Sequence, residues 1–279
     1  MSNQKRELNF KAVENTAPKT LSPEQIREFN EKGFLFPLDA LDPTEAKSHL
    51  EFVNHLMKET HERGGNGYTI NCKHEFLKTL YDLCLHPKIL AVVRDLLGEE
   101  FLAWGTHYFS KESGDAKQVA WHQDASYWPL TPSRTITVWL AIDDVDEENS
   151  AMQVIPGTHL KGHLPWKEVK SPAVLDQELT DVEKLGDPVS ACLKAGQFSV
   201  HTDMTAHGSQ PNFSDRRRCG LTIRYCPKEV RAVSNNGWCS AIHCSGTKAP
   251  HWDYLERPES DDIESSIKHL DKNMANAAR

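Results

Sequence analysis

A histidine and an aspartate two residues apart could together hold a metal ion. His122 and Asp124 stand in the run Trp121-His122-Gln123-Asp124, at the end of a strand-like stretch. Side chains two apart on a strand point to the same face, so these two heads can converge on one ion. One imidazole and one carboxylate suit iron, manganese or zinc. Such pairs are common by chance, so a metal site also needs a ligand from elsewhere in the chain.

A third ligand could come from the segment 201–212, which contains two further histidines, His201 and His207. On a straight strand, residues six apart are separated by about 20 Å at about 3.3 Å per residue. They cannot then share one ion unless the backbone bends. We therefore expect only one of the two to be a ligand.

Three consecutive arginines, Arg216 to Arg218, open the next strand-like stretch. The guanidinium group is a planar fork of N–H donors that matches a carboxylate. Beside a site of two histidines and one carboxylate, an arginine could hold one end of a dicarboxylate while the metal holds the other end.

The elements that must position these residues are helices early in the chain and strands later. Ser22 followed by Pro23, and Asp42 followed by Pro43, are typical helix starts. We expect four helices, at Pro23–Gly33, Pro43 to about Gly64, about 74–85, and Pro87–Leu97, with a short strand at 34–36. Stretches rich in Val, Ile, Thr and aromatic residues predict strands at Phe101–Ser110, Arg134–Asp143, Met152–Pro156, Gln197–Thr202 and Cys219–Cys226.

This order of elements indicates an antiparallel β core supported by N-terminal helices. We predict a mainly β fold whose core is a double-stranded β-helix, the cupin-like jelly roll. No repeat or low-complexity linker interrupts the chain, so residues 1–279 are predicted to form a single domain. Residues 1–20 are predicted to be a mobile arm. The polar segment 160–190 is predicted to be a lid or a surface loop over one end of the barrel.

Composition excludes several classes of protein. The chain has 32 Lys and Arg against 40 Asp and Glu, a net charge of −8, and no basic cluster beyond the three arginines, so we expect no nucleic-acid partner. No apolar run approaches the ~18 residues of a membrane helix, and no secretory signal is visible. The seven cysteines form no CxxC pair, which favours reduced thiols in a cytoplasmic protein.

Three stretches of the sequence together resemble the phytanoyl-CoA dioxygenase family of Fe(II)- and 2-oxoglutarate-dependent oxygenases. They are WHQDASYWPL at 121–130, VWLAIDDVDEENSAMQVIPGTH at 138–159 and HGSQPNFSDRRR at 207–218, with NEKGFLFP at 30–37 as a weaker match. The two ligand motifs are 85 residues apart, and an arginine follows the last histidine by eleven residues. This combination makes the resemblance specific.

The resemblance implies three iron ligands: His122, Asp124 and His207. It implies that Arg218 clamps the distal carboxylate of 2-oxoglutarate, that Ser209 assists, and that Trp139 walls the same pocket. The family has no ligand equivalent to His201. The implied cofactors are Fe(II), 2-oxoglutarate as co-substrate and O2, with succinate and carbon dioxide as products.

The primary substrate is expected to be a small molecule. Arg224 follows Arg218 by six residues on the same predicted strand, so both face the same way and Arg224 is a candidate contact for an anionic substrate. Tyr127 and Trp128 are candidates for the rim of the pocket. The family accepts amino acids, phosphonates, acyl thioesters and natural-product scaffolds, and the sequence does not select among them. It also leaves the oligomeric state open.

We predict that the chain hydroxylates an unactivated C–H bond. Halogenases of the same family replace the carboxylate ligand by a small residue, and Asp124 is present here, which favours hydroxylation or a related desaturation or ring closure. A non-catalytic metal-binding jelly-roll protein would be expected to lose a ligand or Arg218. A zinc hydrolase would not need an arginine that grips a dicarboxylate.

Overall fold

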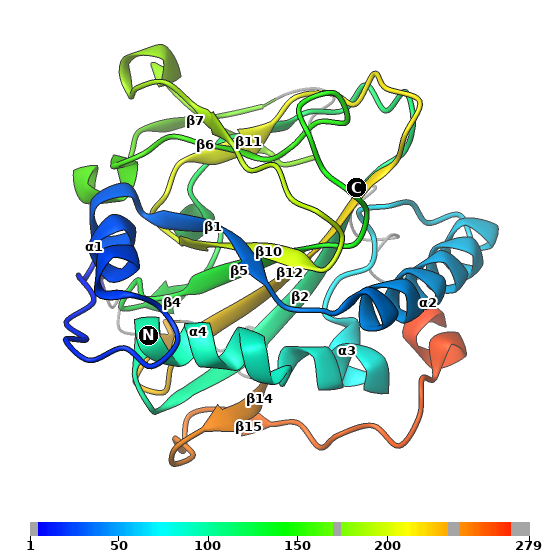
Figure 1. Cartoon of the computed structure of the whole chain (residues 1–279), viewed down its shortest axis with the longest axis horizontal. Helices are drawn as coiled ribbons and strands as arrows, with labels where there is room; N and C mark the ends of the chain where they lie inside the picture. The colour runs from blue at the N-terminus through cyan, green and yellow to red at the C-terminus, as the bar shows by residue number, and fades with distance from the viewer. Residues whose placement is uncertain (1–4, 170–173, 234–239, 269–279) are drawn as a thin grey trace.

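The computed structural model describes residues 5–169, 174–233 and 240–268. It forms two facing β-sheets, with helices against the outer face of the larger sheet (Figure 1). The helices are α1 (Pro23–Lys32), α2 (Pro43–Glu62), α3 (Lys78–Cys84) and α4 (Pro87–Leu97). Short 3-10 turns occur at Lys73–Glu75, Asp124–Ser126, Thr158–Lys161 and Val182–Lys184.

The larger sheet has its strands in the order β1-β10-β5-β12-β2-β14-β15, and all its neighbours are antiparallel except β14 and β15. These strands are β1 (Phe34–Asp39), β10 (Gln197–Thr202), β5 (Ile136–Ala141), β12 (Arg218–Pro227), β2 (Phe101–Lys111), β14 (Ser240–Ser245) and β15 (Asp253–Tyr254). The smaller sheet has the order β3-β11-β6-β9. Its strands are β3 (Val119–His122), β11 (His207–Ser209), β6 (Gln153–Val154) and β9 (Val189–Ser190).

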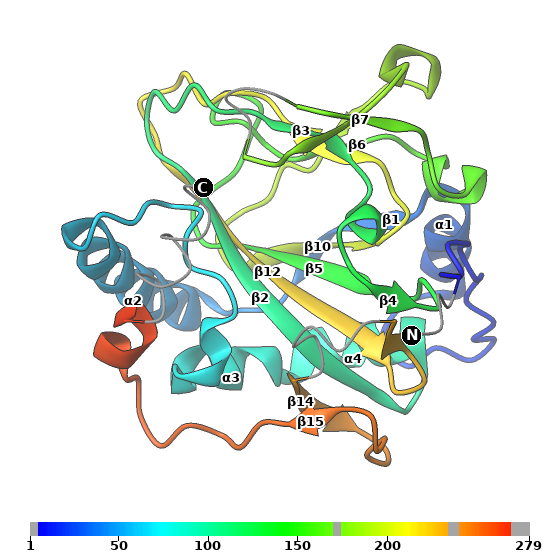
Figure 2. The ribbon, with the colours of Figure 1, turned by 180° about the vertical axis from the view of Figure 1, so that it is seen from behind.

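The two sheets confirm the predicted jelly-roll fold. The view from behind shows β3 and β6 on one side of the larger sheet and α3 and α4 on the other (Figure 2). Two short two-stranded sheets complete the strands: β4 (Leu130–Thr131) with β13 (Arg231–Ala232), and β7 (Trp166–Glu168) with β8 (Gln177–Leu179).

Alternation along β12 divides the core from the cavity between the sheets. Residues on one face pack into the main hydrophobic core with the helices: Cys219, Leu221, Ile223 and Tyr225. Residues on the other face line a cavity that opens toward the smaller sheet: Arg218, Thr222 and Arg224. Because a strand has a period of two, one strand builds the core and the site together.

The helix starts follow the sequence signals. Ser22 accepts a hydrogen bond from the backbone N–H of Gln25, whose side chain accepts one from the N–H of Ser22. Gly33 ends α1 at φ 88°, a left-handed conformation that favours glycine. The helix expected at 74–85 is wrong in its first part, because that part is a 3-10 turn that His74 ties to Thr106 of β2. The strand expected at Met152–Pro156 is shortened to β6.

The N-terminal segment is packed against the protein rather than forming the expected mobile arm. The carboxylate of Asp95 on α4 accepts hydrogen bonds from the backbone N–H groups of Lys19, Thr20 and Leu21. Earlier in the segment, the Asn30 side chain accepts a hydrogen bond from the backbone N–H of Val13 and donates one to the Val13 carbonyl. These partners hold a segment without helix or strand, and no local periodicity signals them. Residues 1–4 lie outside the described residues.

The segment 160–190 forms the β7–β8 pair beside β3, with a 3-10 turn on either side. Residues 170–173 lie outside the described residues. A role of this segment as a lid stays a prediction, and so does the assignment of the whole chain to one domain.

Among the described helices, none is both long enough and apolar enough to cross a lipid bilayer. The expected absence of nucleic-acid and membrane partners and the expected cytoplasmic location stay predictions.

Gly220 on β12 leaves room for the ring of Trp139, and a Cβ atom there would overlap that ring. We expect Gly220→Ala to lower the free energy of unfolding by about 1–3 kcal/mol, the usual cost of overpacking. Gly105→Ala on the neighbouring β2 is the matched control, because its Cβ would meet its nearest neighbour at an ordinary 3.5 Å. Urea unfolding of both variants checks this, and an equal effect at the two glycines would contradict it.

Candidate active site

Strand pairing brings two distant histidines together. His207 opens β11 and is the cross-strand partner of His122, the last residue of β3. Antiparallel partners have Cβ atoms about 4.5–5.5 Å apart. The centroids of these two imidazole rings are 4.1 Å apart. The pairing therefore presents both rings at one point between the sheets.

Asp124 completes a buried group of three side chains, His122, Asp124 and His207, which we call the metal group. Its Oδ1 lies 3.6 Å from His122 Nε2 and 3.9 Å from His207 Nε2. Its Oδ2 accepts a hydrogen bond of 2.8 Å from the Thr137 hydroxyl on β5, which orients the carboxylate. One potential ligand atom from each of the three lies within 4.8 Å of the others.

The hydrogen bonds of the two imidazoles leave Nε2 of each ring free to bind a metal. Nδ1 of His122 lies 2.8 Å from the carbonyl oxygen of Ala120, and Nδ1 of His207 lies 3.0 Å from that of Thr205. A carbonyl only accepts, so Nδ1 carries the hydrogen and Nε2 the lone pair. Two such imidazoles and one carboxylate, with other positions open, form a donor set that fits Fe(II).

Burial and neighbouring side chains set the protonation of the metal group. Burial holds the pKa of His207 well below its usual value, and the imidazoles of His122 and His201 lower it further. Burial would raise the pKa of Asp124, but the His122 and His201 imidazoles in their protonated forms outweigh it, so that pKa lies well below its ordinary value. At neutral pH His207 is therefore neutral and Asp124 ionised, the forms that bind a metal.

His201 lies beside the metal group, contrary to the straight-strand expectation. Its ring centroid is 4.4 Å from that of His207. The chain turns after β10 ends at Thr202, where the N–H of Thr205 donates to the Thr202 carbonyl, so the two histidines are not about 20 Å apart. His201 Nε2 lies 3.6 Å from Oδ2 of Asp124, whereas the other two histidines face Oδ1.

Gln123, which lies between the first two members of the metal group, holds this turn in place. It is fully buried. Its amide nitrogen donates to the carbonyl oxygens of Met204 and Gly162, at 2.6 and 3.0 Å, and its oxygen accepts from the N–H of Leu164 at 2.8 Å. Gln123 thus ties β3 both to the turn before His207 and to the segment 160–190. The sequence patterns did not single it out.

Arg218 lies in the same cavity and is only 2% exposed. Its Nε donates to the Ser150 carbonyl at 3.0 Å, one terminal nitrogen donates to the Phe109 carbonyl at 3.3 Å, and the other donates to Ser209 Oγ at 3.0 Å. Within the described part of the chain, three of its five N–H donors are thus engaged, and two are left for another acceptor. Ser209 lines the cavity as well.

Trp139 lies against Arg218 and is not among the residues that line the cavity. Its role as a wall of the 2-oxoglutarate pocket stays a prediction. The Arg218 Cζ atom lies 5.6 Å from the centroid of the Trp139 ring, a cation–π contact. The ring packs closely on Gly220, where a side chain is absent. Trp139 therefore supports the guanidinium from the core side.

Lys111 is a buried cation that the sequence patterns missed, because the predicted strand stopped one residue before it. It is the cross-strand partner of Arg218 on β2. Its ammonium group donates to the Ser150 hydroxyl and to the carbonyl oxygens of Ser209 and Gln210. Burial, with a smaller contribution from Arg218, lowers its pKa to about 7. A charged residue at the end of an otherwise apolar strand was the one available signal.

The three candidate substrate contacts have different surroundings. Arg224 lines the cavity together with the metal group. Trp128 does not line it, but its ring centroid lies 5.1 Å from Arg224 Cζ. The Tyr127 ring lies 5.8 Å from the His122 ring, and the Tyr127 hydroxyl is hydrogen-bonded to the backbone of Gln177 on β8.

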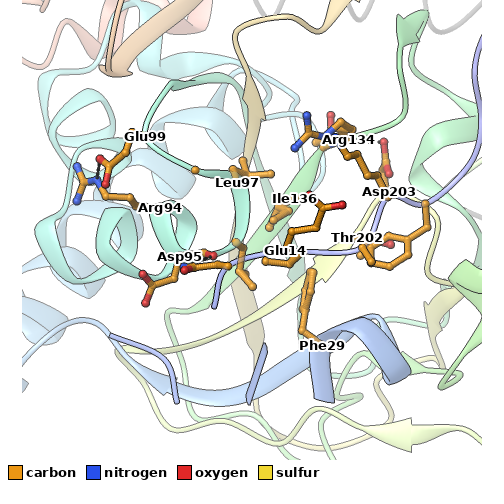
Figure 3. Close-up of a pocket in the computed structure, with 18 of the residues that line it drawn as sticks. Glu14, Phe29, Arg94, Asp95, Leu97, Glu99, Arg134, Ile136, Thr202 and Asp203 are labelled. Carbon is orange, nitrogen blue, oxygen red and sulfur yellow. Dashed lines mark hydrogen bonds and ion pairs between the residues drawn. The ribbon is translucent and has the colours of Figure 1, made fainter. Parts of the chain in front are cut away.

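A larger cavity, of about 340 Å³, lies beneath the N-terminal segment (Figure 3). No member of the metal group lines it. Several of its charged side chains already have partners in the described structure. Arg94 pairs with Glu99 at 3.0 Å, Asp95 holds residues 19–21, and Asp203 accepts from the N–H of Thr135. It has no set of potential metal ligands among the described residues, so it is not the candidate site.

Comparison with known proteins finds similar folds and related sequences. The solved structure of a non-haem monooxygenase, ThoJ, in its apo form, superposes with a TM-score of 0.74 at 29% identity, over 88% of this chain and 98% of that chain. A probable alpha-ketoglutarate-dependent hypophosphite dioxygenase from Stutzerimonas stutzeri is 28% identical over 74% of this chain and 79% of its own length. CytC3 with Fe(II) and alpha-ketoglutarate shares the fold, with a TM-score of 0.63 at 21% identity over 88% and 99% of the two chains.

The fold, the metal group and these relatives define a 2-oxoglutarate-dependent dioxygenase with Fe(II), 2-oxoglutarate and O2 as cofactor and co-substrates. The family model for phytanoyl-CoA dioxygenase matches residues 29–220. The chain belongs to the phytanoyl-CoA dioxygenase family, as the sequence resemblance predicted. Peroxisomal phytanoyl-CoA dioxygenase of Bos taurus is 26% identical over 57% of this chain, which spans about half (49%) of that protein's length.

The low pKa of Lys111 predicts a contribution to stability that depends on pH. Between about pH 7 and 10 the unfolded chain keeps a proton on this lysine that the folded protein has lost, so the free energy of unfolding rises with pH. The rise amounts to about 1 kcal/mol per pH unit, and we expect it to be absent in Lys111→Met. Urea unfolding at several pH values measures it. The exposed Lys58→Met serves as control, and curves for Lys111→Met that stay parallel to wild type would contradict the prediction.

Proposed function

We propose that this protein hydroxylates an unactivated C–H bond of a small metabolite, with release of succinate and carbon dioxide. The observation that carries the proposal is one buried cavity lined by both the metal group and Arg218. When bound to the metal group, the iron supplies oxidising chemistry that couples decarboxylation of 2-oxoglutarate to oxidation of the substrate.

The chain's own residues bind and orient the co-substrate. The two unengaged N–H donors of Arg218 form a fork for the distal carboxylate of 2-oxoglutarate. Ser209 accepts from Arg218 through Oγ, so its hydroxyl hydrogen is available to the same carboxylate. Because Arg218 is buried, water competes little for these bonds, and charge-assisted bonds in such a place are strong.

The alternative reactions fit these residues less well. Asp124 occupies the coordination position and carries the charge that a halide would need, which favours hydroxylation over halogenation. Desaturation or ring closure would use the same residues and differ only in how the substrate lies. A zinc hydrolase or a non-catalytic metal-binding protein has no use for a buried arginine with two unengaged donors.

Removal of one histidine of the metal group is expected to abolish turnover and weaken iron binding, because two remaining ligands hold the ion loosely. We expect this result for His122→Ala and His207→Ala, and retention of iron in His201→Ala. Iron content after anaerobic loading and gel filtration measures both. Loss of iron in the His201 variant together with retention in the His207 variant would overturn the assignment.

Arg218→Lys keeps the charge but loses the planar fork. We expect the KM for 2-oxoglutarate to rise on the order of ten- to a hundredfold, from about 1.5–3 kcal/mol of lost charged hydrogen bonding. Arg216→Lys is the matched control, since Arg216 pairs with Asp146 and Glu148 outside the cavity. Equal effects of the two substitutions would show that Arg218 is not the clamp.

Product analysis tests the reaction type. The wild-type protein with Fe(II), 2-oxoglutarate, O2 and excess chloride is incubated with a panel of small metabolites, and succinate and product masses are measured. We expect a product heavier by one oxygen atom, formed with one succinate per turnover. A chlorinated product would contradict the hydroxylase proposal, and so would the absence of succinate with every compound of a broad panel.

A further inference from the structure

Arg224 is a buried cation that has no hydrogen-bond acceptor among the described residues. It is 9% exposed and lines the cavity that contains the metal group. Over the described ranges, no hydrogen bond or ion pair reaches its guanidinium group, and its Nε is fully enclosed without a partner. Arg218 on the same strand has three such bonds. Burying a charge without a partner costs free energy, so the molecule keeps Arg224 in this state at a cost.

Two tryptophan rings hold the guanidinium group in place. Its Cζ lies 5.6 Å from the centroid of the Trp104 ring and 5.1 Å from that of the Trp128 ring. The two rings meet edge to face, with centroids 4.7 Å apart. A cation–π contact is an attraction between the charge and the ring and supplies no hydrogen-bond acceptor. The N–H donors are therefore left for another group.

A β-bulge places one of these rings. Strand β12 pairs Arg224 with Gly105 and Tyr225 with Ala103, so Trp104 is the extra residue of β2 at the bulge. Bulges re-aim side chains and occur often beside active sites. Here the bulge turns Trp104 toward Arg224 and so contributes to a fixed position of the guanidinium.

Arg224 and Arg218 are set well apart along β12. They are six residues apart on β12, about 20 Å along the strand. Arg224 is the cross-strand partner of Thr137, whose hydroxyl donates to Asp124. Arg224 thus lies on the Thr137 side of the metal group, whereas Arg218 lies at Ser209. With 2-oxoglutarate held at Arg218, the Arg224 side is the part of the cavity we assign to the primary substrate.

We propose that Arg224 binds an oxyanion group of the primary substrate, a carboxylate or a phosphonate-type group. This group accepts two N–H bonds in the guanidinium plane and neutralises the buried charge, while the rest of the substrate extends toward the metal group. The inference rests on the proposed function, because it takes the cavity as that of an oxygenase already holding 2-oxoglutarate. It narrows the substrates to anionic small molecules.

The test uses the protein loaded with Fe(II) and saturating 2-oxoglutarate without O2, so that no turnover occurs and the Arg218 end is filled. Calorimetric titrations compare propionate and ethylphosphonate with propionamide, which has the shape of propionate but no charge. We expect the loaded wild type to bind at least one of the two anions more tightly than the amide. The anion preferred of the two identifies the type of oxyanion.

Arg224→Gln removes the charge and is expected to weaken binding of the preferred anion on the order of ten- to a hundredfold, while binding of propionamide stays unchanged. Arg224→Lys keeps the charge but loses the planar fork, so we expect its affinity for the anion to lie between those of the wild type and Arg224→Gln. This second variant keeps the test informative if Arg224→Gln does not fold. Arg216→Gln, outside the cavity, is the control and is expected to match wild type.

Two results would overturn the inference: equal affinity of the wild type for the anions and the amide, or an unchanged affinity for the anion in Arg224→Gln. Binding of 2-oxoglutarate to the iron-loaded wild type is measured in the same series. If the iron-loaded wild type did not bind 2-oxoglutarate, the proposed function itself would be contradicted. This result differs from 2-oxoglutarate binding with no effect of Arg224 on the anion, which would contradict only the inference.

Discussion

The pairing of His122 with His207 across β3 and β11 is the constraint on which the rest of the site depends. It brings together imidazoles from positions 85 residues apart and leaves Asp124, two residues further, within reach of both. A slip of one residue in either strand would turn one ring to the other face of the sheet. Two further contacts stabilise this arrangement. Gln123 holds the turn before His207, and the Thr137 hydroxyl orients the carboxylate of Asp124.

The two sheets contribute different parts of the site. The smaller sheet and the turn after β3 supply the metal group, and strand β12 of the larger sheet supplies the two arginines. The opposite face of β12 is packed on the helical core, so the arginines project from a rigid support. Each guanidinium has an aromatic ring against it, Trp139 behind Arg218 and Trp128 beside Arg224. Burial makes every charged interaction in this cavity stronger than it would be in water.

Local signals in the sequence were sufficient for the starts of α1, α2 and α4, for five strands of the larger sheet (β1, β2, β5, β10 and β12) and, with the family resemblance, for the choice of the metal group. They did not predict β14 and β15 or the start of α3. They were insufficient wherever distant partners decide the path of the chain. The turn after β10 depends on a bond from Gln123 across 81 positions, so a straight-strand argument misplaced His201. The bonds from Asp95 to the N-terminal segment and the burial of Lys111 likewise come from contacts that no local pattern reveals.

A crystal structure of the protein with Fe(II) and 2-oxoglutarate, prepared without O2, tests the central claim most directly. Anomalous scattering locates the iron, and electron density locates the co-substrate. The account predicts one iron bound by all three members of the metal group, with the distal carboxylate of 2-oxoglutarate on Arg218. Iron bound by His201 in place of a member of the metal group, or that carboxylate on Arg224, would contradict it.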